Sequence, residues 1–316
     1  MQSINHLFAL PPSTTKYLNV LSIGLRRNSL SLPILSPAHA SENRMIERRR
    51  LITEAAGADV LDNDELLLDE KFVLEAGLQI QAMPKHLAVI ADGHRRWARQ
   101  KGMPAKFGHT TFVPGHRELA RLCCKCGIKA LTAFLFSPGN WKRPKEQVEF
   151  MMSLFEEGLR SNLEPSMRHD IRISIIGDRR GLSKSFQEVI TEAEEKTRAN
   201  TRLHIILAIN YGGQSEIVEA CRTLCKKVKE GLIEEEEINQ KMFEQELWTN
   251  ICPEFPFPDM LIRFSGEQRL SDFLAYQLAY AELYFPETLF PDFGEEEFLK
   301  AMKQFQQRKR RYGGGE

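Results

Sequence analysis

The sequence predicts a single α/β domain with a mainly parallel central sheet that is flanked by helices on both faces. Three observations support this fold class. Apolar runs of strand length recur along the chain after Pro84. The runs are almost continuously hydrophobic, as expected for strands that are buried on both faces. Segments with helical periodicity separate the runs, and this alternation is typical of βαβ units.

The expected elements follow one another in a regular order. The five expected strands cover residues 87–91, 130–136, 171–176, 203–209 and 260–263. Helical periodicity is clearest over 144–168, 183–198 and 214–229. No internal repeat is visible, and residues 84–316 are expected to form one domain.

The first 41 residues differ in composition from the rest of the chain. They contain no Asp or Glu, they are rich in serine, and Lys16, Arg26 and Arg27 supply positive charge. This composition is typical of an organelle transit peptide. The alternatives are an unstructured tail without a function and a secretory signal that ends near Ala38-His39-Ala40. Residues 42–83 are more charged and are expected to form a linker with short helices.

Charge and cysteine usage exclude several classes of protein. Lys+Arg and Asp+Glu both number 43, so the formal net charge is +0. This balance argues against a general binder of nucleic acid or of anionic membranes. No apolar run is long enough to form a transmembrane segment. Cys123, Cys124 and Cys126 lack the paired spacing of a zinc site, so the six cysteines are interpreted as small core residues in a reducing compartment.

The residues that follow the expected strands point to a site for a multiply charged anion. In an open α/β sheet, ligands bind beyond the carboxyl ends of the strands. Four of the five strand ends carry arginine, and the residues concerned are Arg95, Arg96, Arg143, Arg179, Arg180, Arg263 and Arg269. The guanidinium group suits phosphate oxygens, and helix N-termini add backbone donors. The sequence has neither a P-loop nor a G-x-G-x-x-G motif, so nucleotide and dinucleotide enzymes are disfavoured.

Seven motifs, in order, resemble those of the cis-prenyltransferases, the family of undecaprenyl diphosphate synthase. The motifs are Asp92-Gly93-x-Arg95-Arg96-Trp97-Ala98, Gly108-His109, Phe136-Ser137-x-x-Asn140-Trp141-x-Arg143-Pro144, Ile175-Ile176-Gly177-Asp178, Asn210-Tyr211-Gly212-Gly213, Ile262-Arg263-x-Ser265-Gly266-Glu267-x-Arg269-x-Ser271 and Ala281-Glu282-Leu283-Tyr284-Phe285. The resemblance covers about residues 84–314. It implies a Mg²⁺-dependent prenyl-diphosphate synthase that acts as a homodimer.

The resemblance also implies roles for individual residues. Asp92 and Glu282 would hold Mg²⁺, which prefers few carboxylates together with phosphate oxygens and water. The catalytic residues would be Asp92, His94, Ser137 and Asn140. The substrate-binding residues would be Gly93, Arg95, Arg96, Trp97, His109, Trp141, Arg143, Arg263, Arg269 and Ser271. Trp141 would pack over the prenyl chain, or it would be an ordinary core tryptophan.

The sequence departs from the family pattern close to the expected site. His94 stands where the family nearly always has asparagine, and it introduces a titratable base with a pKa near ~6.5. Ala105 stands where an arginine is common. Neutral drift would account for each change alone, whereas the clustering favours an altered substrate geometry.

Bulky side chains predict a short product. Long-chain members need a hydrophobic tunnel lined by small residues, whereas Phe112, Leu135, Phe150 and Phe155 flank the expected channel. We expect a product of ten or fifteen carbons. The favoured reaction joins two dimethylallyl diphosphates head-to-middle to give lavandulyl diphosphate in the plastid stroma. The alternatives are neryl diphosphate, made from dimethylallyl and isopentenyl diphosphates, and a non-catalytic partner subunit of a polyprenol synthase.

Overall fold

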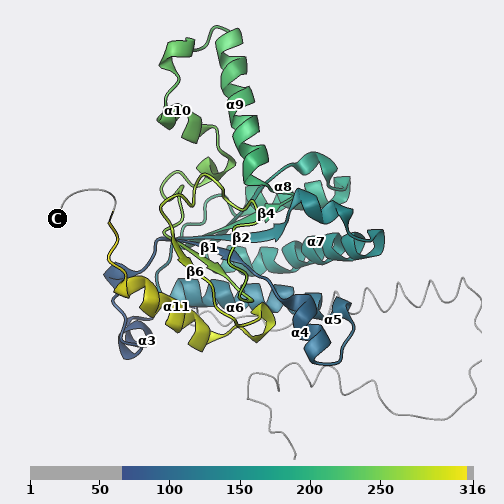
Figure 1. Ribbon diagram of the computed structural model, residues 1–316, viewed down its shortest axis with the longest axis vertical. Coiled ribbons are helices and arrows are strands. Elements are labelled where there is room, and N and C mark those ends of the chain that lie inside the picture. Colours follow the sequence, from purple (N-terminus) through teal and green to yellow (C-terminus); the bar gives the residue numbers. More distant parts are fainter. Residues whose placement is uncertain (1–65, 312–316) are drawn as a thin grey trace, which may run out of the picture. The chain divides into compact units, whose positions relative to one another are not determined.

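Six parallel strands form the central sheet in the computed structural model, which describes residues 66–311 (Figure 1). The spatial order is β3-β4-β2-β1-β5-β6. The strands are β1 (His86–Ile90), β2 (Ala130–Phe136), β3 (Ile171–Ile176), β4 (Leu203–Ile209), β5 (Met260–Arg263) and β6 (Glu282–Tyr284). The expected parallel α/β fold is confirmed, and the transit peptide expected over residues 1–41 lies outside the described residues.

Side chains of successive strand residues point to opposite faces of the sheet, and both faces are buried. In β1, Leu87 and Val89 belong to one hydrophobic cluster, whereas Ala88 and Ile90 belong to another. This division explains why the strands read as continuous apolar runs in the sequence. The sequence did not predict β6, because it has only three residues and all of them are partly buried.

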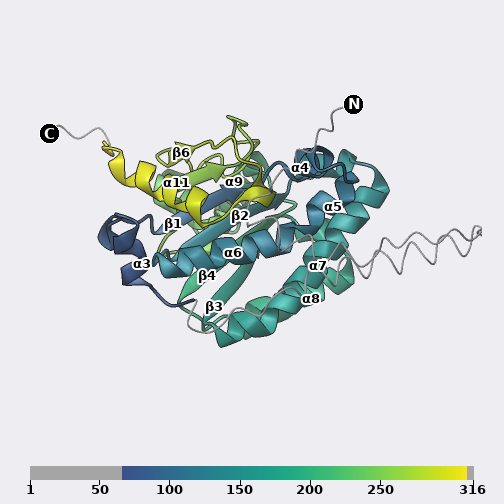
Figure 2. The ribbon, with the colours of Figure 1, turned by 90° about the horizontal axis from the view of Figure 1, so that it is seen from below.

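Long helices cover one face of the sheet. Figure 2 shows α6 (Phe112–Lys125) between α11 (Glu295–Gln307) and α7 (Lys145–Arg168). The neighbouring helix α8 (Lys184–Lys196) packs with α7 on β3. Their apolar stripes bury Leu119, Leu154, Phe186 and Phe298 almost completely.

The opposite face is covered mainly by irregular chain. Phe273, Leu274 and Leu278 pack there against Ala88 and Leu261. Helix α9 (Gly213–Lys229) begins at this layer and extends away from the sheet together with α10 (Gln240–Gln245) (Figure 1). Two short helices, α4 (His94–Gln100) and α5 (Ala105–Thr110), connect β1 to α6.

The segment 66–83, expected as part of a linker, contributes to the core. It contains the short helix α3 (Glu70–Glu75), and Leu66, Val73 and Leu78 are buried in the cluster beneath α6 and α11. The cysteines divide into two groups. Cys123, Cys124, Cys126 and Cys252 are buried, as the core interpretation requires. The interpretation is wrong for Cys221 and Cys225, which are exposed on α9.

Candidate functional site

The candidate site lies at the carboxyl edge of the sheet. Its first residue in the sequence is Asp92, which follows β1 after Ala91. The Asp92 Oδ1 accepts a hydrogen bond of 2.6 Å from the backbone N–H of Gly93. Gly93 precedes α4 with a φ of 104°, which strongly favours glycine because other side chains clash in this region. The turn therefore fixes the Asp92 carboxylate directly beyond the end of the strand.

Two predicted arginines converge on Asp92. The Oδ2 of Asp92 lies 3.3 Å from Nη2 of Arg263 and 3.5 Å from Nη2 of Arg96. Arg96 also lies 3.4 Å from the Glu267 carboxylate and donates to the hydroxyl of Ser265 at 2.5 Å. The structure thus brings together residues that follow β1 and β5, as the parallel topology requires.

Arg263 is the most buried cation of this group. Only 4% of the residue is exposed, and its guanidinium donates to the Arg269 carbonyl and, at 2.7 Å, to the Ser271 hydroxyl. Its Nε atom is buried without a hydrogen-bond partner in the part of the chain that the structure describes. Arg269 is exposed and pairs with Glu267. A buried donor without a partner indicates that a ligand or water completes the site.

The loop that carries Ser271 is conformationally strained. Ser265, Ser271, Asp272 and Leu274 all have positive φ values, from 46° to 79°. Such conformations cost free energy in residues other than glycine, and they persist where the surrounding structure enforces them. The sequence gives no signal for this strain, although the motif around Arg263 marks the loop.

A second group of cations lies beside Asp92. Burial, and then the neighbouring Arg95, lower the pKa of Arg143. Burial, and then Arg143 and Arg95, lower the pKa of His109 to about 4. Neither ring nitrogen of His109 has a hydrogen-bond partner, and neither Arg95 nor Arg143 forms an ion pair with a carboxylate, within residues 66–311. These groups leave an unneutralised positive potential that favours a bound anion.

His94 differs from its expected state. The residue is 7% exposed, and its Nδ1 lies 3.0 Å from the Gly108 carbonyl oxygen and 3.2 Å from the Thr111 hydroxyl. Burial, and then His109, lower its pKa to about 3, so the expected titration near pH 6.5 is wrong. The His94 ring packs against Phe112 and Phe290 at centroid distances of 5.8 and 5.5 Å. It is a neutral imidazole in an aromatic environment.

Ser137, Asn140 and Trp141 form a turn after β2. The Asn140 Oδ1 accepts a hydrogen bond of 3.0 Å from the Ser137 N–H, so this amide stabilises the turn. Trp141 is 38% exposed and donates from Nε1 to Asn210 at 2.8 Å. It is therefore not a core tryptophan. All three residues lie at the same sheet edge as Asp92, because β1 and β2 are parallel neighbours.

Some residues at this edge are engaged in local structure. Trp97 is 5% exposed, and its Nε1 donates to Asp292 at 2.7 Å. Arg179 pairs with Glu194, and Arg180 pairs with Asp178, at 2.6 and 2.8 Å. Both arginines after the third strand thus have carboxylate partners, and their part in the anion site stays a prediction.

Glu282 does not meet Asp92 within one chain. It is the first residue of β6 and pairs in register with Met260, which pairs with Leu87 near the start of β1. Asp92 lies beyond the other end of β1. Glu282 instead forms an ion pair of 2.6 Å with Arg308. A metal site that uses both carboxylates would need a second copy of the chain.

An apolar cavity of about 130 Å³ lies between α6, α7 and the sheet. The wall nearest the carboxyl edge of the sheet contains Phe112, Phe155 and Leu135. The ring centroids of Phe112 and Phe155 are 5.2 Å apart. Phe150 is buried but is not part of the lining. Three of the four bulky residues expected beside a channel therefore line this cavity. The sequence did not single out His116, which also lines the cavity. The His116 ring packs against Phe112, with ring centroids 4.1 Å apart.

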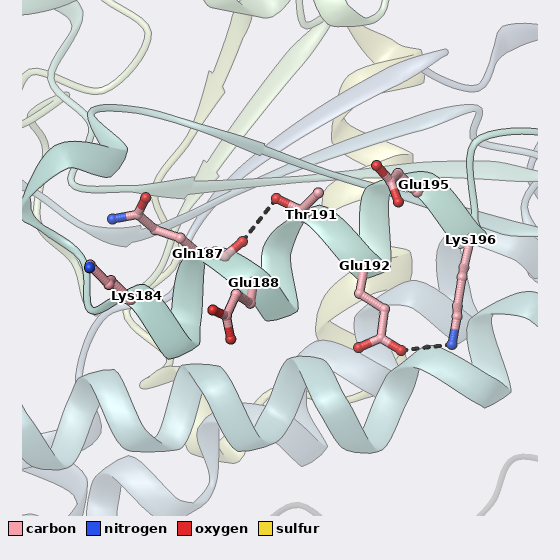
Figure 3. Close-up of a pocket in the computed structure, with 7 residues that line it drawn as sticks. All are labelled: Lys184, Gln187, Glu188, Thr191, Glu192, Glu195 and Lys196. Carbon is pink, nitrogen blue, oxygen red and sulfur yellow. Dashed lines mark hydrogen bonds and ion pairs between the residues drawn. The ribbon is translucent and has the colours of Figure 1, made fainter.

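A larger surface hollow, of about 490 Å³, lies elsewhere. Figure 3 shows that its labelled side chains all belong to α8 and include the ion pair of Glu192 with Lys196. None of the predicted site residues lines it. Within residues 66–311, no three His, Cys, Asp or Glu side chains are arranged to hold a metal. No helix in the same range is long and apolar enough to cross a membrane.

The profile of the undecaprenyl diphosphate synthase family matches residues 90–313. The chain belongs to this family of prenyltransferases. The match includes the ends of all six strands and the loop that carries Ser271.

Individual relatives support the assignment of this chain to the prenyltransferases. It is 46% identical over 285 residues to the chloroplastic cis-prenyltransferase 4 of Solanum lycopersicum, covering 90% of this chain and 89% of the relative. It is 48% identical over 234 residues to the chloroplastic (2Z,6Z)-farnesyl diphosphate synthase of the same species, covering 74% and 80%. The crystal structure of lavandulyl diphosphate synthase from Lavandula x intermedia, in complex with dimethylallyl diphosphate, is 42% identical with a TM-score of 0.72. That alignment covers 74% of this prenyltransferase and 100% of the other chain.

Proposed function

We propose that this prenyltransferase is a short-chain synthase that condenses two dimethylallyl diphosphates head-to-middle to give lavandulyl diphosphate. The observation that carries the proposal is one juxtaposition. A cation-rich edge with a partly exposed carboxylate, Asp92, adjoins an apolar cavity of only about 130 Å³. The first feature suits two diphosphates, and the second suits a short hydrocarbon.

Asp92 is the residue that would hold Mg²⁺. About 36% of its side chain is exposed, and its carboxylate is flanked by the cations that would contact the same diphosphate. Mg²⁺ is usually bound through one or two carboxylates, with phosphate oxygens and water completing its shell, so this sparse acidic set fits. When bound, the ion would neutralise charge on the diphosphate that leaves.

The cations around Asp92 would be divided between two diphosphates, and each diphosphate would contact members of both groups of cations. Gly93, Arg95, Arg96 and His109 would bind the diphosphate of the allylic donor. Arg143, Arg263, Arg269 and Ser271 would bind the diphosphate of the acceptor. Donors that are fixed before the reaction stabilise the developing charge without reorganisation, and this is a large catalytic effect.

The small cavity supports a product of ten carbons. A cavity of about 150 Å³ holds a benzene-sized group. A space of about 130 Å³ therefore accommodates a five-carbon unit. The contact between Phe112 and Phe155 narrows the cavity at the end nearest the carboxyl edge of the sheet. A long prenyl chain would require these rings to move in a close-packed interior, which is unfavourable.

Proton removal would involve His94, Ser137 or Asn140. A neutral imidazole is a competent proton acceptor for a carbocation, because the cation is a far stronger acid than an imidazolium. The low pKa of His94, about 3, means that the ring is already unprotonated at neutral pH. A diphosphate oxygen is the alternative acceptor, and His94 would then position the substrate.

The prenyltransferase would act as a homodimer through α9. Val218, Cys221 and Cys225 are exposed on α9 at spacings of three and four residues, which place their side chains on one helix face. A second copy offers the same apolar stripe, as a two-fold interface requires. Assembly would also provide the second chain that a shared role of Glu282 needs. We place the protein in the plastid stroma, in line with the chloroplastic names of its relatives.

Product analysis tests the proposal. The purified protein, started at Ser41, is incubated with Mg²⁺ and dimethylallyl diphosphate, with and without isopentenyl diphosphate. A branched ten-carbon diphosphate from dimethylallyl diphosphate alone is expected. Linear neryl diphosphate made only from the mixture would replace the proposed regiochemistry with head-to-tail chemistry. No product from any combination would favour the non-catalytic partner subunit. Sedimentation of the same sample measures the dimer.

A further inference from the structure

The apolar cavity has a floor at the amino edge of the sheet, and one residue of the N-terminal segment forms part of it. The lining of the cavity includes Leu66, Ser166, His169 and Ile171. Ile171 is the first residue of β3, and His169 is the residue at which α7 ends. These residues lie at the opposite end of the strands from Asp92.

The helix lining gives the direction of the cavity. From α6 it includes Phe112, Val113, His116, Arg117 and Ala120, which lie on one helix face. Eight residues separate Phe112 from Ala120, so the cavity extends about 12 Å along this helix at a rise of about 1.5 Å per residue. A prenyl chain whose diphosphate lies at Asp92 would therefore enter past Phe112 and grow toward Leu66.

Leu66 is held firmly in this position. The residue is fully buried at 0% exposure, and its carbonyl oxygen accepts a hydrogen bond of 3.2 Å from Nη1 of Arg202, just before β4. Three residues further on, the Asp69 N–H donates to the Lys125 carbonyl at 3.0 Å. The Asp69 carboxylate also pairs with the Lys125 ammonium at 3.7 Å. The segment is thus tied to the C-terminal end of α6 and to the start of β4.

We propose that Leu66 is a specificity-determining residue, because its side chain closes the far end of the cavity and limits the length of the prenyl chain. This inference rests on the proposed function as a prenyl-diphosphate synthase. It adds a second limit to the narrowing at Phe112 and Phe155. It also assigns a role in specificity to a segment that precedes the first strand.

Removal of the side chain at the floor should lengthen the product. Leu66→Ala deletes an isopropyl group and leaves space that a close-packed interior fills only in part. We expect the share of products longer than ten carbons to rise about 10-fold when isopentenyl diphosphate is supplied, since a fully buried hydrophobic group decides the fit. Leu67→Ala is the matched control, because Leu67 is 49% exposed on the same segment. It should leave the product lengths unchanged.

Ligand binding tests the floor without turnover. Without Mg²⁺, Leu66→Ala should bind farnesyl diphosphate about 10-fold more tightly than the wild type, whereas the affinity for inorganic pyrophosphate should not change. Leu66→Val, a smaller deletion, should give an intermediate effect and serves if the alanine variant does not fold. Wild-type product lengths and farnesyl affinity in a folded Leu66 variant would overturn the proposal. A wild-type protein that makes no prenyl product at all would refute the proposed function instead, and the binding measurement would still decide the role of Leu66.

Discussion

The two edges of the sheet use their polar side chains in different ways. At the amino edge, several polar groups satisfy one another. Glu282 pairs with Arg308 at 2.6 Å, and the Asp259 carboxylate accepts from the backbone N–H groups of Lys85 and His86 at 2.7 and 3.0 Å. At the carboxyl edge, both nitrogens of His109 and the Nε of Arg263 lack partners among the residues that the structure describes.

This difference separates stability from ligand binding. A buried polar group without a partner costs about 1–3 kcal/mol, so a fold keeps several of them together only where something else satisfies them. Cations without carboxylate partners add to the cost by mutual repulsion, and the pKa of Arg143 is lowered by burial and then by the neighbouring Arg95. The carboxyl edge is therefore organised for an anion, whereas the amino edge is organised for folding.

The largest expected effect comes from the carboxyl edge. Asp92→Ala should lower the turnover rate at least ~10²-fold, because the variant lacks the main protein ligand of the proposed metal. The fold should persist, since Asp92 is partly exposed. Steady-state rates over a range of Mg²⁺ concentrations, with circular dichroism, measure both effects.

A matched change at the amino edge sharpens this comparison. Asp259→Asn should destabilise the fold by about 0.5–1.5 kcal/mol, the range for one intramolecular hydrogen bond, because the Asp259 side chain is only partly buried, while the turnover rate stays close to that of the wild type. Near-normal activity of Asp92→Ala in excess Mg²⁺ would remove Asp92 from the metal site.

Both edges should lose stability in mild acid. Burial is the main cause that lowers the pKa of five histidines to about 3 or 4, and these are His86, His94, His109, His116 and His204. The unfolded chain therefore binds more protons than the folded chain below pH 6.5. For each buried histidine, the free energy of unfolding falls by about 1.4 kcal/mol per pH unit between pH 6.5 and the folded pKa.

Urea unfolding at pH 7.5 and pH 5.5 measures this loss. His86 is at the amino edge, where its Nδ1 and Nε2 bond to Phe255 and Thr132. The His86→Gln variant should show a pH dependence that is smaller by about 1 kcal/mol over this interval. Equal free energies of unfolding at the two pH values would contradict the neutral state of these rings.

A smaller effect is expected at His94, which would either accept the proton itself or position the substrate while a diphosphate oxygen accepts it. His94→Asn should slow the head-to-middle reaction and shift products toward the linear type when isopentenyl diphosphate is present. The pKa of about 3 predicts that the wild-type rate has no acidic limb near pH 6–7 that arises from this ring. Rates and products of both proteins from pH 5.5 to 8 test this. An unchanged product ratio in the variant would exclude His94 from the control of regiochemistry.

The sequence predicted much of the carboxyl edge because the rule that brings it together is simple. Parallel strands end at one edge, so Asp92, Arg96 and Arg263 meet although 171 residues separate the first from the last. The continuous apolar runs also placed five of the six strands. Both inferences need only the local pattern and the topology.

The features that the sequence did not reveal depend on distant contacts. Glu282 lies at the opposite edge because β6 is parallel to β5, which a three-residue strand does not reveal. Arg179 is paired by Glu194 from α8, across 15 positions of sequence. The low pKa of His94 follows mainly from burial against Phe112 and Phe290. Neither phenylalanine is a neighbour of His94 in the sequence.

The smallest effect is expected from removal of residues 1–40, most of the expected transit peptide. This change tests whether those residues contribute to the amino edge of the sheet. Within residues 66–311, the first contact that closes this edge is the hydrogen bond of Leu66 with Arg202. A protein that starts at Ser41 retains this contact and the later ones, so its turnover rate and its free energy of unfolding should equal those of the full chain. Start sites at Ser41 and at Asp69 form a matched pair, because only the second removes Leu66. The second protein should be less stable and should make longer products. Aggregation or inactivity of the Ser41 protein, with an active full chain, would show that residues 1–40 belong to the working enzyme.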